Sequence, residues 1–371
     1  MTSLRKTIAA LAGTTLLFGA LVGCSSERSD AETTDAASDT PLIGIAMPTK
    51  SLERWNNDGK HLDELLKKIG YETTLQYADN KVDQQITQLQ NMINDGADVL
   101  VIASIDGTAL GPVLQTAADK KIPVIAYDRL INDTANVDYY ATFDNELVGT
   151  LQGQFIEEKL DLAGGAGPFN LEPFAGSPDD NNARFFFKGA WDVLQPYVEK
   201  GQLVVPSGKG PATLDDWTTI GIQGWESAKA QSEMENRLNS FYTDKKVDVV
   251  LSPNDSLALG IEQALSGSGY TSADWPIITG QDADEANVKN MIAGMQSMTV
   301  WKDTRTLGDQ VAKMVGQIID GQTVTVNDEK TYNNGVKVVP AYLLPPEVVV
   351  PDTIQSLLVD SNFYTADKLG L

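Results

Sequence analysis

The chain has 371 residues, 42% of them hydrophobic and 21% charged, a balance typical of a globular protein and not of a disordered one. This length exceeds what a single hydrophobic core usually organises, so we expect two domains. The 51 acidic residues outnumber the 28 lysines and arginines, and the resulting net charge of −23 argues against nucleic acid as a partner, because such a surface repels phosphate backbones.

The N-terminus carries the features of an export signal. Arg5 and Lys6 precede the apolar run IAALAGTTLLFGALVG, which is too short for a stable membrane span and typical of a signal-peptide core. The run ends at Cys24, the only cysteine of the chain. The segment Leu21-Val22-Gly23-Cys24 resembles the lipobox of bacterial lipoproteins, in which this cysteine is lipidated. We therefore predict a lipoprotein signal peptide over residues 1–23, lipidation of Cys24 and no disulfide within the chain.

Residues 24–40 follow as a polar segment. The sequence SSERSDAETTDAASDT holds no large apolar residue, so it cannot bury enough surface to order itself. We expect a flexible tether between the membrane and the folded part.

From residue 41 onward, short apolar runs alternate with amphipathic segments. The leucines and isoleucine at 62, 65, 66 and 69 recur with the spacing of one helical face, and Gly70 ends the pattern. We predict strands over 41–47, 73–78, 98–103 and 122–127, and helices over 56–70, 82–96 and 107–121. This alternation indicates a parallel sheet with helices on both faces.

A second series of the same kind begins near residue 146. We predict helices over 146–160, 181–198, 227–243 and 256–269, and strands over 168–176, 202–207, 247–253 and 276–280. An extended segment, a helix over 306–321 and the extended run GVKVVPAYLLPPEVVV come last, which suggests that the chain crosses again between the two halves. The fold class predicted is α/β, with two doubly wound parallel-sheet domains.

Polar residues gather just after the predicted strands, where ligands bind in open parallel sheets. They include Lys50, Arg54, Trp55, Ser104, Asp106, Asp128, Arg129, Ser177, Asp179, Asn181, Asn182, Asn254, Asp255, Gln281, Asp282 and Lys302. Carboxylates accept hydrogen bonds, basic groups donate them and amides do both, a combination that suits the hydroxyls and ring oxygen of a neutral sugar. Trp55 and Trp225 could pack against the C–H face of such a ring.

Each of these residues also has a purely structural alternative. Three of them could cap helices: Asp106, Ser177 and Asp179. The adjacent Asp128 and Arg129 could form a local surface pair of little energetic value. Trp191 lies at a helical position suited to core packing, and His61 lies on a charged helix face where solvation is its expected role.

The chain resembles a known family in motifs spread from about residue 42 to its end. These are GIAMPTKSLERW, VIASIDGT, VIAYDRL, YYATFDN, GSPDDNNA, VDVVLSPND, TGQDADEANV, KDTR and NNGVKVVPAYLL. They resemble the periplasmic sugar-binding proteins of ABC importers, in particular the ChvE-type multiple-monosaccharide-binding proteins and the xylose-binding proteins. The resemblance implies a type I binding-protein fold in which three crossovers join two lobes that close on one sugar. We expect an N-terminal lobe over 42–143 plus 303–335 and a C-terminal lobe over 144–302 plus 336–371.

The same resemblance implies a ligand-binding set, carried over motif by motif. It comprises Arg54, Trp55, Asp128, Arg129, Asn182, Trp225, Asn254, Asp255, Asp282 and Lys302. Two departures bear on specificity. Residues 211–225 differ from the loop of the family, and Asn254 stands where the family has a tyrosine or a similar residue.

These features predict a non-catalytic, monomeric receptor that captures an aldopentose or aldohexose, of the glucose, galactose, xylose or arabinose class. It would deliver the sugar to an ABC permease and its ATPase. The chain has no GxxxxGK[ST] phosphate loop and no calcium-loop spacing, so we expect no cofactor, no metal and an energy source in the partner.

Three other functions are alternatives to this one. A secreted glycoside hydrolase could use Asp128, Asp255 and Asp282, but their Arg and Asn neighbours should keep them ionised and leave no acid with a raised pKa. A sugar-responsive transcription regulator conflicts with the export signal, the acidic charge and the lack of a helix-turn-helix before residue 41. A receptor for a furanose-like signalling molecule stays open, because the same fold accepts one.

Overall fold

The structure, a computed structural model, describes residues 40–371. The predicted signal peptide, Cys24 and the tether up to residue 39 lie outside the described residues. Within residues 40–371, no helix combines the length and the apolar character needed to cross a membrane.

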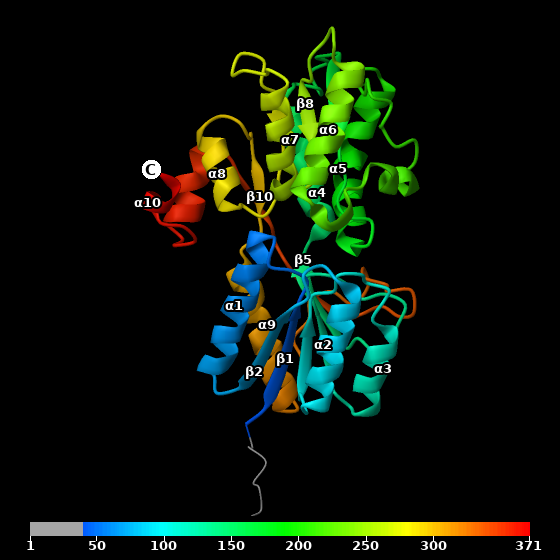
Figure 1. The fold of residues 1–371 in the computed structure, drawn as a ribbon, viewed down its shortest axis with the longest axis vertical. Coiled ribbons are helices and arrows are strands. Elements are labelled where there is room, and N and C mark those ends of the chain that lie inside the picture. The colour runs from blue at the N-terminus through cyan, green and yellow to red at the C-terminus, as the bar shows by residue number, and fades with distance from the viewer. Residues whose placement is uncertain (1–39) are drawn as a thin grey trace, which may run out of the picture. The chain divides into compact units, whose positions relative to one another are not determined.

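The first lobe is built on a six-stranded sheet in the order β11-β5-β4-β3-β1-β2, with every pair parallel. The strands are β1 (Leu42–Met47), β2 (Glu72–Tyr77), β3 (Val99–Ile102), β4 (Val124–Tyr127), β5 (Tyr139–Phe143) and β11 (Ala341–Leu344). Two helices cover each face: α1 (Glu53–Lys68) and α9 (Thr304–Ile319) on one, α2 (Val82–Asn94) and α3 (Gly111–Asp119) on the other (Figure 1). This is a doubly wound sheet.

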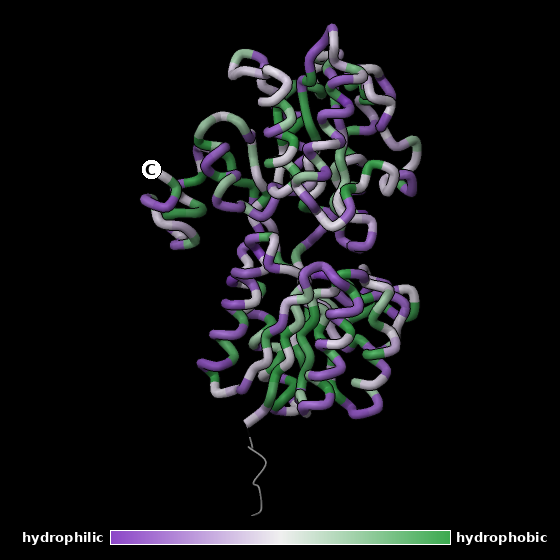
Figure 2. The backbone as a smooth tube through the Cα atoms, in the orientation of Figure 1, coloured by the Kyte–Doolittle hydropathy of each residue, from purple (hydrophilic) through white to green (hydrophobic). Residues whose placement is uncertain are grey.

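The alternation of side chains along β1 explains why both faces are covered. Ile43 and Ile45 belong to the core under α1 and α9, whereas Ala46 belongs to the core under α2 and α3. Successive side chains of a strand point to opposite faces, so a strand that is apolar throughout needs two layers of helices. Figure 2 shows the hydrophobic strands between helices with mixed surfaces. At Gly44 an added Cβ would lie 2.7 Å from a Leu100 methyl carbon, so a larger residue would force the packing apart.

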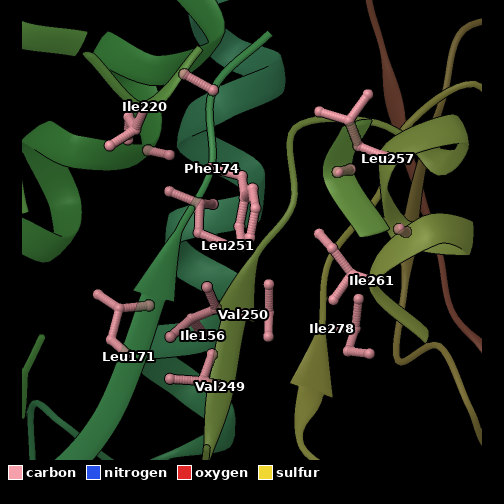
Figure 3. Packing of buried hydrophobic residues seen from close by; sticks show 14 of the residues in the cluster. Ile156, Leu171, Phe174, Ile220, Val249, Val250, Leu251, Leu257, Ile261 and Ile278 are labelled. Carbon is pink, nitrogen blue, oxygen red and sulfur yellow. The ribbon is translucent and has the colours of Figure 1, made fainter. Parts of the chain in front are cut away.

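The second lobe contains a four-stranded parallel sheet in the order β7-β6-β8-β9. Its strands are β6 (Phe169–Pro173), β7 (Leu203–Val204), β8 (Val249–Leu251) and β9 (Ile277–Ile278). The flanking helices are α4 (Asn145–Lys159), α5 (Asn181–Glu199), α6 (Ser227–Phe241) and α7 (Asp255–Gly267). Figure 3 shows how Leu171, Val249 and Leu251 of the strands pack with residues of the neighbouring segments.

Helices α4 and α5 approach each other closely because glycines face the contact. A Cβ at Gly149 would lie 1.8 Å from the backbone oxygen of Phe186, and one at Gly189 would lie 2.0 Å from that of Glu146. Any side chain at these two positions would push the helices apart. This crossing fixes α5, whose first turn belongs to the site described below.

The C-terminal part adds a small core of its own beside the second lobe. Strand β10 (Thr299–Trp301) pairs antiparallel with β12 (Glu347–Val349) and bridges to Gln281, which follows β9. Around this pair lie α8 (Glu285–Ile292), the short helices η3 (Pro351–Thr353) and η4 (Gln355–Val359), and α10 (Ala366–Leu369). Met291, Trp301, Leu358 and Tyr364 form its buried centre.

The chain passes between the lobes three times: from β5 to α4, from β10 to α9, and from β11 to β12. The α/β class with two doubly wound domains and a three-crossover hinge is therefore confirmed. One predicted boundary is wrong: the C-terminal lobe is expected to include residues 336–371, whereas β11 (341–344) pairs with β5 in the first sheet. In the run GVKVVPAYLL, residues 335–337 form a bend and Ala341–Leu344 form the strand. The sequence of this run does not indicate which sheet accepts the strand.

Candidate functional site

A polar pocket lies between the two lobes, where residues that follow the strands and begin the helices meet. About 300 Å³ of space, open solvent included, lies between its lining atoms. The first lobe contributes Leu52, Arg54, Trp55, Asp128 and Arg129, and the second contributes Asp180, Asn182, Phe186, Trp225, Asn254, Gln281, Asp282 and Lys302. Arginine, lysine, carboxylate and amide side chains thus surround three aromatic rings.

The pocket contains nine of the ten side chains predicted to bind ligand. The structure does not bring Asp255 to it. Asp255 is the first residue of α7, is fully buried, and accepts hydrogen bonds from Gln296, Thr299 and the backbone N–H of Asp284. Its carboxylate therefore holds the loop after β9 and the start of β10 together behind the pocket.

Burial raises the pKa of Asp255 well above its ordinary value, and the neighbouring Asp284 adds to the shift. The expectation that none of the predicted acids has a raised pKa is therefore wrong for this residue. It holds for Asp128, where burial opposes ionisation but Arg54, Lys302 and Arg129 outweigh it and lower the pKa. Of these two predicted acids, the one with the raised pKa is the one that does not reach the pocket.

Four lining residues were absent from the predicted ligand set: Leu52, Asp180, Phe186 and Gln281. Gln281 does follow a predicted strand, and it is among the polar residues expected at the carboxyl ends of the strands, where ligands bind in parallel sheets. Asp180 and Phe186 belong to α5 and its N-cap, and the motif SPDDNN offers two adjacent aspartates without showing which one turns inward.

Arg54 lies at the centre of the charge network. Its Nη2 donates to Asp58 at 2.8 Å and to Asp128 at 3.1 Å, and its Nη1 lies 3.6 Å from Asp282 in the opposite lobe. Burial alone would lower the pKa of this guanidinium, but Asp128, Asp58 and Asp282 raise it well above its ordinary value. Arg54 is therefore a fixed cation that contacts carboxylates from both lobes.

The indole of Trp55 is flanked by two arginines. The Arg54 guanidinium carbon lies 4.4 Å from the ring centroid and that of Arg129 lies 5.1 Å away, both within cation–π range. The indole is 2% exposed, and stacking on it fixes the plane of each guanidinium. Both predicted arginines are thus oriented by the predicted tryptophan.

Asp180 joins the lobes from the other side. Its Oδ2 lies 2.9 Å from Nε of Arg129 in the first lobe and accepts the indole N–H of Trp225 at 3.1 Å. Its Oδ1 caps the start of α5 by accepting the backbone N–H of Asn182. Burial raises the pKa of Asp180 even though the positive charge of Arg129 opposes the shift.

Three lining residues have left-handed backbone conformations, which are uncommon outside glycine. The φ angle is 59° at Asp128, 56° at Trp225 and 99° at Asp282. Such conformations cost of order 1–3 kcal/mol each and cluster at functional sites. All three side chains line the pocket, and at Trp225 the preceding Gly224 also has a positive φ of 74°.

The side chain of Asn182 forms hydrogen bonds within the protein that link the two lobes. Its Nδ2 donates to the backbone oxygen of Asp128 at 2.7 Å, and its Oδ1 accepts from Tyr140 at 3.0 Å and from Asn145 at 3.1 Å. Asn254 is the N-cap of α7 and accepts the backbone N–H of Leu257. Both amides line the pocket and also form hydrogen bonds to backbone groups beside it.

Several buried polar atoms of the pocket have no hydrogen-bond partner among residues 40–371. Three are donors, Nε of Arg54, Nε1 of Trp55 and Nε of Arg129, and two are acceptors, Oε1 of Gln281 and Oδ1 of Asp282. The Arg129–Asp180 and Lys302–Asp282 contacts are ion pairs by distance, without the angles of a hydrogen bond. Unpaired buried polar groups are rare, so the three atoms with neither kind of partner in this part of the chain, Arg54 Nε, Trp55 Nε1 and Gln281 Oε1, point to a polar ligand.

The structural alternatives account for most of the remaining polar residues. Asp106 accepts from the backbone and side chain of Thr108 at the turn before α3, and His61 is partly exposed beside Asp309. Trp191 is buried and stacked on Phe187 in the core of the second lobe. Among residues 40–371, no group of three or more His, Cys, Asp or Glu side chains is arranged to hold a metal ion.

Two doubly wound lobes around one polar pocket, joined by three crossings, define a type I two-lobed binding protein. The chain belongs to the periplasmic binding protein family, whose domain model matches residues 43–323. This is a family of binding proteins, and the relatives described next are named as receptors and binding proteins, not as enzymes.

Similarity to individual members extends over most of the chain. It is 50% identical over 335 residues to the multiple sugar-binding periplasmic receptor ChvE of Rhizobium radiobacter, covering 90% of this chain and 93% of the receptor. It is 36% identical over 327 residues to the D-xylose-binding periplasmic protein of Escherichia coli, covering 88% and 92%.

Among solved structures, an ABC transporter solute binding protein of Clostridium phytofermentans with bound β-D-glucose shares 52% identity at a TM-score of 0.85. That match covers 88% of this chain and 99% of the other. The predicted resemblance is thereby confirmed, and the family places the protein outside the cytoplasm.

Proposed function

We propose that this protein captures an uncharged monosaccharide, an aldopentose or aldohexose, between its two lobes. The observation that carries this proposal is the set of unpaired donors and acceptors in a single pocket beside buried indoles. A polyhydroxylated ring offers partners for both kinds of atom, since each hydroxyl donates and accepts. Multiple sugar-binding and xylose-binding relatives and a glucose-bound neighbour support the same ligand class.

The charges that line the pocket support a neutral ligand. Three cations, Arg54, Arg129 and Lys302, lie among the same number of carboxylates, which are Asp128, Asp180 and Asp282. A pocket balanced in this way needs no net charge from the ligand. In the dry interior each hydrogen bond from a charged group to a sugar hydroxyl is stronger than in water.

The nine predicted residues that line the pocket, Arg54, Trp55, Asp128, Arg129, Asn182, Trp225, Asn254, Asp282 and Lys302, are the proposed ligand contacts. To these we add Asp180, Phe186 and Gln281. Because both lobes supply groups, the ligand favours the closed arrangement by its contacts to each.

Calorimetric titration of the purified protein in detergent with glucose, galactose, xylose and arabinose tests the proposal. We expect at least one of them to bind with an affinity of micromolar or better. Sorbitol, which has similar hydroxyls and no ring, is the control. If none of the four aldoses binds, the proposal fails. A furanose arm, with galactofuranose, tests the alternative ring form.

We further propose that Cys24 carries a lipid and that the closed protein delivers its sugar to an ABC permease with its own ATPase. The lipobox-like Leu21-Val22-Gly23-Cys24 supports the first point, and the ABC solute binding neighbour supports the second. Cys24→Ser should move the protein from the membrane fraction to the soluble fraction of the host. In reconstituted vesicles, sugar-loaded protein should stimulate the permease's ATPase more than sugar-free protein does.

A further inference from the structure

A carboxylate outside the pocket contacts one of its central groups. Asp58 lies one helical turn after Arg54 in α1, is 0% exposed and is not part of the pocket lining. Its Oδ2 accepts from Nη2 of Arg54 at 2.8 Å. Tyr127 of β4 and Thr304, the first residue of α9, lie beside it.

Burial at this position makes an ionised carboxylate energetically unfavourable. Leu62 and Leu66, the next inward-facing residues of α1, belong to the hydrophobic core. A carboxylate among such neighbours is destabilising unless it is paired, and a buried ion pair is at best weakly favourable for stability. The presence of a buried carboxylate at position 58 is therefore better explained by its contact with Arg54 than by a gain in folding stability.

The contact decides which way the guanidinium points. Asp58 and Asp128, both in the first lobe, share Nη2 of Arg54. Nε then has no partner among residues 40–371, and Nη1 faces Asp282 of the second lobe at 3.6 Å. Nη2 is thus held by two carboxylates of its own lobe, while Nη1 points toward the second lobe.

We infer that Asp58 is a positioning residue of the ligand site, which holds Nη2 of Arg54 so that Nη1 is presented to the bound sugar. The inference rests on the proposed function for the identity of the ligand. Without Asp58, Asp128 alone holds Nη2, and the guanidinium is free to turn further toward Asp282 and to shorten the 3.6 Å contact that Nη1 already makes with it across the pocket. The sugar then has to compete with that pair.

The first test is the affinity of Asp58→Asn, which keeps the shape of the side chain and removes its charge. We expect the sugar dissociation constant to rise about 10- to 100-fold, as for the loss of one hydrogen bond to a charged group. Glu64→Gln, an exposed position of the same helix, is the matched control and should bind like the wild type. Wild-type affinity in Asp58→Asn would overturn the inference.

A double-mutant cycle separates positioning from a general structural role. Arg54→Lys keeps the charge but loses the fork, so it should weaken binding by a similar factor. Adding Asp58→Asn to it should change the affinity less than threefold, because the group that Asp58 positions is gone. Fully additive effects would contradict the inference. If Asp58→Asn does not fold, Arg54→Lys alone can still refute the inference. Wild-type sugar affinity in Arg54→Lys would show that the orientation of the Arg54 guanidinium does not matter for binding.

A spectroscopic test needs no sugar. Arg54 stacks on Trp55, so its reorientation should shift the emission of this indole, measured as the difference between each protein and its Trp55→Phe counterpart. A shift in Asp58→Asn and none in Glu64→Gln is the expected result, and no shift would count against positioning. If the shift occurs while the wild type binds none of the sugars, the proposed function fails and the positioning role stands.

Discussion

Arg129 of the first lobe and Asp180 of the second face each other across the pocket, with Nε and Oδ2 2.9 Å apart and both side chains buried. Asp180 also accepts the indole N–H of Trp225 and caps α5. One carboxylate therefore links an arginine, a tryptophan and a helix start.

Replacing this carboxylate should weaken ligand binding strongly. In Asp180→Asn the buried Arg129 keeps its charge and loses its counterion, a situation that costs several kcal/mol. We expect about a 10- to 100-fold rise in the sugar dissociation constant, measured by calorimetry. Asp192→Asn, an exposed position on the same helix, should change the affinity less than twofold. Equal affinity in the two variants would show that the link is irrelevant to the ligand.

The indole of Trp225 packs directly against Gly176. A Cβ at this position would lie 2.0 Å from Cη2 of the ring, so Gly176→Ala has to displace the indole. We expect sugar affinity to fall at least tenfold and stability to fall by about 1–3 kcal/mol, the usual result of overpacking. Gly111→Ala, where an added Cβ meets nothing within 4 Å, is the control. Unchanged binding in Gly176→Ala would mean that the position of Trp225 does not matter to the sugar.

Glu262, buried in α7 of the second lobe, should make stability depend on pH. Burial raises its pKa from 4.5 to about 7, although a hydrogen bond from Asn290 opposes the shift. The folded state therefore binds the proton more tightly than the unfolded state. The resulting stability is fully present below about pH 4.5 and is lost as the pH rises through 7.

Glu262→Gln removes this titration and provides the test. Relative to the wild type, its free energy of unfolding should rise by about 3 kcal/mol between pH 4 and pH 8. Unfolding measured at a series of pH values shows the change. The exposed Glu158→Gln should follow the wild type at every pH. A difference between Glu262→Gln and wild type that does not vary with pH would disprove the assignment.

Glu53, next to Arg54 in α1, touches the second lobe outside the pocket. Its carboxylate accepts from the backbone N–H of Glu285 at 3.3 Å and lies 3.4 Å from the Tyr364 hydroxyl, whose one proton is shared with the backbone oxygen of Ala283 at 3.0 Å. These contacts are long, so Tyr364→Phe should weaken sugar binding only about two- to fivefold, by making closure less favourable. Tyr342→Phe, within the first lobe, is the calorimetric control. A loss above tenfold, or none, would contradict this role for the contact.

Much of the fold could be predicted because its strands are short apolar runs and its helices have one apolar face. Strand β5 and helix α8 were missed. The segment YYATF carries two tyrosines and follows a polar stretch, while EANVKNMI has too few apolar residues to show a helical face. Both depend on tertiary contacts: β5 lies between β4 and β11, and α8 covers the C-terminal core.

The site could be predicted to the level of the segment, and less well to the level of the residue. The strand-end rule identifies the loops that meet, because parallel strands share one carboxyl edge. It does not separate neighbours such as Asn254 and Asp255, of which only the first lines the pocket. The direction of each side chain depends on the first turn of the helix that follows, and local patterns do not reveal it.

Strand β11 completes the first lobe with residues 341–344, almost at the end of the chain. Until these residues leave the ribosome, β5 is an open sheet edge whose backbone groups on that side have no strand to pair with. Helix α9, which covers one face of the same sheet, also comes after the whole second lobe has been synthesised. The first half of the molecule to be made is therefore among the last parts to be finished, and a chain that stops shortly before residue 341 leaves both lobes incomplete.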